Sequence, residues 1–129
     1  MLDKGETTQM LLKLIDACTE CRQIFHAESS AWTNAVQRHT IEKVQQKLDQ
    51  FGIELRSEIR RLGDHDDLGI FPFEPLRRYS GDVAFGRVLD RYQQALNSRL
   101  TPHSRAMLKR QYSDLRQAYQ ELDSVQGAA

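Results

Sequence analysis

The sequence predicts an all-α fold, an antiparallel four-helix bundle formed by residues 1–129 as a single domain. Apolar residues recur at steps of three and four in four stretches, which is the spacing of one face of an α-helix. Strict alternation of apolar and polar residues, the pattern of a half-buried strand, occurs nowhere. Several of the three prolines and seven glycines gather between Gly63 and Gly81, which leaves long uninterrupted stretches on either side.

The first two helices are expected at about residues 8–30 and 34–62. Thr7 and Thr8 can both cap the start of the first helix. Its apolar face contains Leu11, Leu14, Ile15, Cys18, Cys21, Phe25 and Trp32. The apolar face of the second helix contains Ile41, Val44, Leu48, Phe51, Leu55, Ile59 and Leu62. The second helix should end before Gly63, because arginines followed by glycine are a typical C-terminal signal.

The last two helices are expected at about residues 82–98 and 102–124. The apolar face of the third contains Phe85, Val88, Leu89, Tyr92, Ala95 and Leu96. Thr101 followed by Pro102 is a strong start signal for the fourth, because a capping hydroxyl precedes a proline at the first helical position. The apolar face of the fourth contains Leu108, Tyr112, Leu115, Tyr119 and Leu122.

The helical pattern disappears in the connector between Gly63 and Gly81. A connector of this length without secondary structure is uncommon in a compact domain. A helix of about 25 residues is roughly 38 Å long, and about 17 extended residues reach roughly 55 Å. The connector is therefore long enough to run the length of the bundle, whereas the two other joints are short enough to make antiparallel helix pairs.

The overall composition excludes several classes of protein. Eighteen basic residues balance eighteen acidic ones, so the chain lacks the concentrated positive charge of a nucleic-acid binder. No apolar run approaches the length of about 20 residues that spans a bilayer, and residues 1–6 do not resemble a secretory signal. Two cysteines cannot form a disulfide framework. We therefore expect a cytoplasmic protein, of bacterial origin, that binds neither nucleic acid nor membrane.

A motif in the second helix resembles a known family. The motif is Phe51-x-x-Glu54-Leu55-x-x-Glu58-Ile59-x-Arg61-Leu62-Gly63. It is similar to the second-helix signature of a ferritin-like family of uncharacterised bacterial proteins, a domain of unknown function. The resemblance extends from about Thr8 to Val125, and further matching residues are Leu14, Ile15, Phe25, Tyr92, Ala95, Leu96 and residues 100–111. It implies a ferritin-like topology, with a long connector between helices 2 and 3, and implies no established activity.

The chain departs from that family at positions where a metal site would lie. Arg22 and Gln23 stand where the family tends to carry glutamates, and residues 82–85 replace an acid-rich stretch. Ala118 or Tyr119 falls where the family has a histidine. A di-iron bundle needs inward acids on all four helices, including two Glu-x-x-His pairs, and none of the four histidines has a glutamate three residues before it. We therefore expect no metal and no cofactor.

Cys18 and Cys21 form a Cys-x-x-Cys motif and are a candidate thiol pair. Redox dithiols of the thioredoxin type lie at the start of a helix that follows a strand, whereas this pair lies within a predicted helix on its apolar face. A structural zinc site would need two further ligands at suitable spacing, and none is evident. The pattern favours two buried cysteines that act as small apolar residues.

Three weaker signals concern binding. Residues 64–67 offer oxygen and imidazole ligands to a cation, but they match no EF-hand spacing and a solvated turn is favoured. The connector also carries candidate interaction residues, which are Ile70, Phe71, Phe73 and Leu76. They form an interface if they are exposed, and packing on the bundle is the alternative. Arg22 lies near the apolar face of its helix, where it either pairs with an inward acid such as Glu58 or extends its charge into solvent.

No phosphate-binding glycine loop, nucleophile elbow or paired carboxylate motif occurs in the chain. The sequence therefore predicts a non-enzymatic, ferritin-like helical bundle, an interaction or stress-associated accessory protein that binds a protein partner or self-associates. The alternative is a metal-binding or redox protein of the ferritin-like type, which requires acids or histidines on three inward faces. A third hypothesis, a helical regulator of a partner protein, requires an exposed apolar groove.

Overall fold

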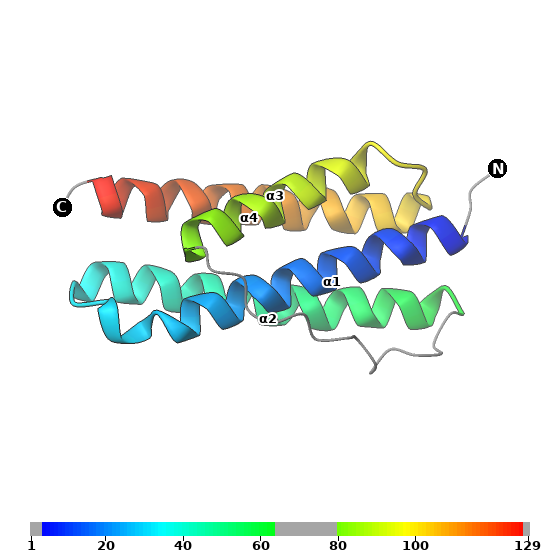
Figure 1. Cartoon of the computed structure of the whole chain (residues 1–129). Helices are drawn as coiled ribbons and strands as arrows, with labels where there is room; N and C mark the ends of the chain where they lie inside the picture. The colour runs from blue at the N-terminus through cyan, green and yellow to red at the C-terminus, as the bar shows by residue number, and fades with distance from the viewer. Residues whose placement is uncertain (1–3, 64–79, 128–129) are drawn as a thin grey trace.

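The computed structural model describes residues 4–63 and 80–127 and places the four apolar stripes on four α-helices, except that Trp32, predicted on the first helix, lies after that helix has ended. The elements are α1 (Lys4–Ala27), the 3₁₀ helix η1 (Ser29–Ala31), α2 (Ala35–Arg61), α3 (Gly81–Leu96) and α4 (Pro102–Gly127). The four α-helices lie side by side (Figure 1), and the described residues contain no strand. The predicted all-α fold with four helices is confirmed.

Contacts between the helices arrange them in a ring in the order α1, α2, α4, α3. Neighbours in the ring point in opposite directions, and the end of α2 and the start of α3 lie far apart along the bundle (Figure 1). Next to the start of α1, the Thr7 hydroxyl donates to the carbonyl of Arg99, just after α3, at 3.4 Å. At the other end, the Gly81 N–H that begins α3 donates to Glu28 at 2.6 Å.

The ends of α2 and the start of α3 follow ordinary capping chemistry. The Asn34 side chain accepts hydrogen bonds from two N–H groups in the first turn of α2, at 2.8 and 3.2 Å. The Ser80 hydroxyl accepts one in the first turn of α3 at 3.3 Å. α2 ends at Arg61, and Gly63 has a φ of +86°, a left-handed conformation that glycine adopts at low cost. The predicted end of α2 is thus confirmed.

The predicted start of α1 is wrong. The helix begins at Lys4, so Thr7 and Thr8 lie inside it and do not cap it. Both threonines are buried, and Thr7 bonds across to the residue after α3. A threonine hydroxyl can hydrogen-bond to nearby backbone groups, and this local preference favours helix caps over helix interiors. The contact with the end of α3 outweighs that local preference.

The buried apolar residues form one cluster to which all four helices contribute. Every residue of the apolar stripe predicted for α2 is buried. Near the start of α3, Phe85 meets Phe25 and Tyr119 edge-on, with ring centroids 6.3 and 5.2 Å apart. No helix in the described part of the chain has an apolar stretch long enough to cross a membrane.

Candidate functional site

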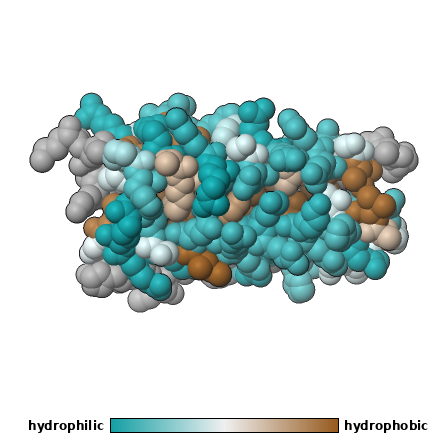
Figure 2. Space-filling view, turned by 180° about the vertical axis from the view of Figure 1, so that it is seen from behind, coloured by the Kyte–Doolittle hydropathy of each residue, from teal (hydrophilic) through white to brown (hydrophobic). Residues whose placement is uncertain are grey.

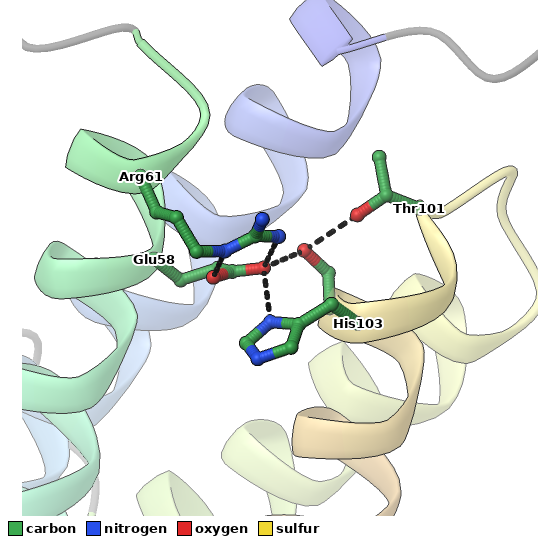
Figure 3. A network of polar contacts seen from close by, with 5 residues as sticks. Glu58, Arg61, Thr101 and His103 are labelled. Atoms are coloured by element: carbon green, nitrogen blue, oxygen red, sulfur yellow. Dashed lines mark hydrogen bonds and ion pairs between the residues drawn. The ribbon is translucent and has the colours of Figure 1, made fainter.

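A buried carboxylate links the end of α2 to the start of α4 (Figure 3). Only 2% of the Glu58 side chain is exposed. Arg61, on the same helix, donates hydrogen bonds to both carboxylate oxygens of Glu58, with N···O distances of 2.6 and 2.8 Å. From α4, the Ser104 hydroxyl donates to Oε2 at 2.5 Å, and His103 Nδ1 lies 3.0 Å from the same oxygen. Thr101 completes the network by donating to Ser104 Oγ at 2.9 Å.

Local sequence explains this arrangement. Glu58 and Arg61 are three residues apart on α2, so their side chains share one face of the helix. α4 begins at Pro102, which places His103 and Ser104 in its first turn. The N-terminal turn of a helix favours a nearby negative charge, because its N–H groups point outward and carry partial positive charge. The carboxylate of Glu58 supplies that charge.

The network fixes the charge of Glu58 and the tautomer of His103. Burial alone would raise the pKa of Glu58, but the hydrogen bonds from Arg61, Ser104 and His103 outweigh it and lower that pKa from 4.5 to about 2. Glu58 is therefore an anion at neutral pH. Because a carboxylate only accepts hydrogen bonds, Nδ1 of His103 must carry the proton in their contact. In the neutral ring, Nε2 is then an acceptor.

A second carboxylate, Glu54, lies one turn before Glu58 on α2. Its Oε1 accepts hydrogen bonds from Arg110 at 2.7 Å and from the Gln111 amide at 2.8 Å, and its Oε2 accepts one from Gln50 at 3.1 Å. Burial alone would raise the pKa of Glu54, but these hydrogen bonds lower it below its ordinary value. Both carboxylates are thus held as anions by donors from this chain.

A groove of about 660 Å³ lies over the two carboxylates, between α2 and α4. Its apolar lining comes from Ile53 on α2 and from Ala106 and Met107 on α4. Ile53 is 66% exposed, which makes it one of the few large apolar side chains open to solvent in the described residues. Arg61 and Arg110 line the same groove. The groove combines two guanidinium groups with an apolar surface formed by Ile53, Ala106 and Met107, which we call the apolar floor.

A buried polar chain leads from the groove into the core. Gln111, which is fully buried, donates to Glu54 and accepts a hydrogen bond from the Tyr92 hydroxyl at 2.7 Å. Tyr92 in turn hydrogen-bonds to the thiol of Cys18. One residue from each helix therefore takes part, and every link pairs a donor with an acceptor. Such a fully satisfied network favours one arrangement of the four helices over others.

Cys18 and Cys21 are both buried and are not bonded to each other. Burial raises the pKa of Cys18 to about 12, although the hydrogen bond to Tyr92 lowers it in part. Burial also raises the pKa of Cys21 well above its ordinary value, and the neighbouring Cys18 adds to the rise. This environment is opposite to that of a reactive thiol, which is exposed and has a lowered pKa.

We expect Cys18 and Cys21 to react with a disulfide reagent at least about a hundredfold more slowly in the native protein than in denaturant, because the thiolate form is suppressed and access requires local opening. Both rates are measured by following, against time, the absorbance of the chromophore that the reagent releases on reaction. Equal rates in the two conditions would contradict the buried position of the pair and would favour a redox role.

The structure decides between the two alternatives for Arg22, while other candidate residues lie outside the described part of the chain. Arg22 pairs with Asp49 at 2.9 Å and not with Glu58. The Arg22 side chain is 40% exposed and that of Asp49 59%, so Arg22 lies at the boundary of the core with its charge directed to solvent. The candidate cation turn, residues 64–67, lies outside the described residues, as do the candidate interaction residues Ile70, Phe71, Phe73 and Leu76.

Several residues of the groove carry no signal in the apolar pattern. His103 and Ser104 belong to the first turn of α4, where the sequence points only to the start of a helix. Arg110 is one of many basic residues on polar helix faces. Glu58-x-x-Arg61 is the one local signal, because this spacing allows a pair on a single helix.

Comparisons of the sequence with protein-family models and with curated proteins, and a comparison with solved structures, find no match. In the described residues, no three His, Cys, Asp or Glu side chains lie close enough together to hold a metal ion. The groove between α2 and α4 is therefore the candidate site that the geometry of the described residues offers.

Proposed function

We propose that this chain is a non-catalytic interaction protein, an accessory protein of the bacterial cytoplasm that binds a protein partner through the groove between α2 and α4. The exposed side chain of Ile53, set in a groove with Ala106 and Met107, is the observation that carries this proposal. An apolar hollow rimmed by polar residues is typical of an interaction site. The groove also fits the hypothesis of a helical regulator, which requires such a surface.

The surface around the groove indicates the kind of complex. Seen from behind, where α2 and α4 face the viewer, the bundle is mainly hydrophilic, and hydrophobic side chains form only small separate patches (Figure 2). Obligate partners bury large apolar areas, whereas small patches within a polar surface are typical of transient contacts. We infer a reversible complex that leaves the bundle folded on its own.

The polar groups of the groove support binding over catalysis. Glu54 and Glu58 have lowered pKa values, so neither is a proton donor at neutral pH. The Ser104 hydroxyl is buried and donates to Glu58, and its oxygen accepts from Thr101. A nucleophilic serine would instead donate to a histidine base. These side chains therefore act as a structural link between α2 and α4.

The same proposal includes a ferritin-like topology and a stress-associated accessory role. α2 and α3 point the same way along the bundle (Figure 1), which supports a long crossover between them. Ferritin-like bundles have one such crossover. The resemblance of the second-helix motif, residues 51–63, supports the same assignment.

A photo-crosslinking amino acid at position 106 tests the proposed function. Ala106 is exposed and lines the groove, and Gln9, exposed on α1, is the matched control position. In bacterial cells that express the full chain, we expect irradiation to give a discrete heavier adduct from position 106 and none from position 9. Mass spectrometry of the adduct separates a partner protein from a second copy of this chain.

The variant Ile53→Asp completes that experiment. Ile53 is exposed, so the substitution leaves the core intact, and it puts a charge into the apolar floor of the groove. We expect the adduct from position 106 to disappear in this variant while its thermal melt stays unchanged. Equal adducts from positions 106 and 9, or no adduct from either, would show that the groove is not the interaction surface.

A further inference from the structure

We infer that the groove binds an amphipathic helix of a partner protein that carries acidic residues four positions apart, next to apolar residues. This inference rests on the proposed function and adds the chemistry of the partner. It follows from which charges are exposed in the groove, from the spacing of the glutamates that bind the two arginines, and from the apolar residues that line the same groove.

The exposed charges of the groove are cationic, although its formal charges balance. Arg61 and Arg110 have 50% and 52% of their side chains exposed. Their partners are shielded, since only 2% of Glu58 and 26% of Glu54 is exposed. A partner that approaches from solvent therefore meets guanidinium groups before it meets carboxylates, and an acidic side chain is the complementary group.

Within residues 4–63 and 80–127, both guanidinium groups have N–H groups beyond those that bind the two glutamates. An arginine side chain has five N–H groups in a planar fork. Arg61 directs two of its nitrogens to Glu58, and Arg110 directs one to Glu54. The remaining N–H groups can bind a second carboxylate, and arginine is well suited to this because its fork matches the geometry of a carboxylate.

The spacing of the two glutamates that bind the arginines sets the spacing of the acids that we infer on the partner. Arg61 is bound to Glu58 and Arg110 to Glu54, and these glutamates are four residues apart on α2. One helical turn of four residues rises about 6 Å. Acidic residues at positions i and i+4 of a partner helix repeat that spacing along one face.

The apolar floor selects the remaining positions of the partner. Ala106 and Met107 line the groove from α4, and Ile53 lines it from α2. In an amphipathic helix, positions i+3 and i+7 lie beside positions i and i+4 on the same face. Apolar side chains at i+3 and i+7 would contact the floor while the acids contact the arginines. This is the helix-in-groove type of recognition.

A synthetic peptide tests this inference directly. The probe is a fluorescent amphipathic peptide of about 18 residues with Glu at i and i+4 and Leu at i+3 and i+7, long enough to be partly helical. Its control has Gln in place of both glutamates. Fluorescence anisotropy with the full chain should show binding of the acidic peptide, about tenfold weaker binding of the Gln peptide, and weaker binding of the acidic peptide as salt rises.

Two protein variants locate the contact. Arg110→Gln removes a cation of the groove, and Lys109→Gln removes the same charge from the neighbouring position, which does not line the groove. We expect Arg110→Gln to weaken binding of the acidic peptide about tenfold and Lys109→Gln to change it less than about twofold. Circular dichroism melts of both variants show that each is folded before the comparison is made.

The inference would be overturned if Arg110→Gln and Lys109→Gln weakened binding of the acidic peptide equally. It would also be overturned if the two peptides bound with equal affinity, or if the acidic peptide did not bind. The crosslinking experiment separates this failure from failure of the proposed function. An adduct from position 106 together with no preference for the acidic peptide would leave the interaction role standing and reject this partner chemistry. No adduct from position 106 would reject the interaction role itself.

Discussion

Replacing Glu58 with alanine should lower the free energy of unfolding by about 1–3 kcal/mol, because a buried hydroxyl would be left without its acceptor, whereas Arg61 is 50% exposed and would be solvated. The Ser104 hydroxyl would keep its donor Thr101 but lose its acceptor in a buried position. The link between α2 and α4 would also be lost. Urea denaturation followed by circular dichroism measures the change. Glu42→Ala, at an exposed position of the same helix, should change stability by less than about 0.5 kcal/mol.

The contribution of Glu58 should depend on pH with a definite sign. Its pKa in the folded protein is lowered from 4.5 to about 2, so the folded state holds this proton less tightly than the unfolded state. The stabilisation is therefore full at pH values above 4.5 and is lost as the pH falls towards about 2. The difference in unfolding free energy between wild type and Glu58→Ala should shrink over that range. A difference that does not vary with pH would show that the carboxylate charge is not its source.

Most of the fold follows from the spacing of apolar residues. In α2, six apolar residues recur with helical period, and they are buried together with Leu62 just after the helix, because one face of a long helix has to be covered by its neighbours. The positions of Cys18 and Cys21 in the core follow from the same rule. The start of α1 does not follow from the apolar spacing, because the Thr7 hydroxyl donates a hydrogen bond to the carbonyl of Arg99, which is distant in the sequence. Local propensity is a weak guide wherever such a long-range contact competes with it.

The candidate site is harder to predict, because it depends on how two helices are aligned. Glu58 is recognisable as an acid near an apolar stripe, but its partners are Arg61, Ser104 and His103, and Arg22 turns instead to Asp49. Four amphipathic stripes predict that the helices share a core, and they leave open which polar residues on α2 and α4 meet. That alignment is set by the detailed packing of the side chains along the interface.

Replacing Gly81 with alanine should lower the free energy of unfolding by about 2–3 kcal/mol through overpacking. An added Cβ would lie 2.4 Å from two ring carbons of Phe25 and 2.7 Å from a carboxylate oxygen of Glu28. The ring has little room to move, because it meets Trp32 and Phe85 edge-on at centroid distances of 6.4 and 6.3 Å. The hydrogen bond from the Gly81 N–H to Glu28 also requires this close approach.

The same substitution in the same helix should have the opposite effect at Gly86. An added Cβ there meets no atom within 4 Å, and alanine is favoured over glycine by about 1 kcal/mol inside a helix. Gly86→Ala should therefore raise the free energy of unfolding by up to about 1 kcal/mol, while Gly81→Ala lowers it. Chemical denaturation of the two variants beside the wild type measures both changes. If Gly81→Ala matched Gly86→Ala in sign, the close packing of α3 against the end of α1 would be wrong.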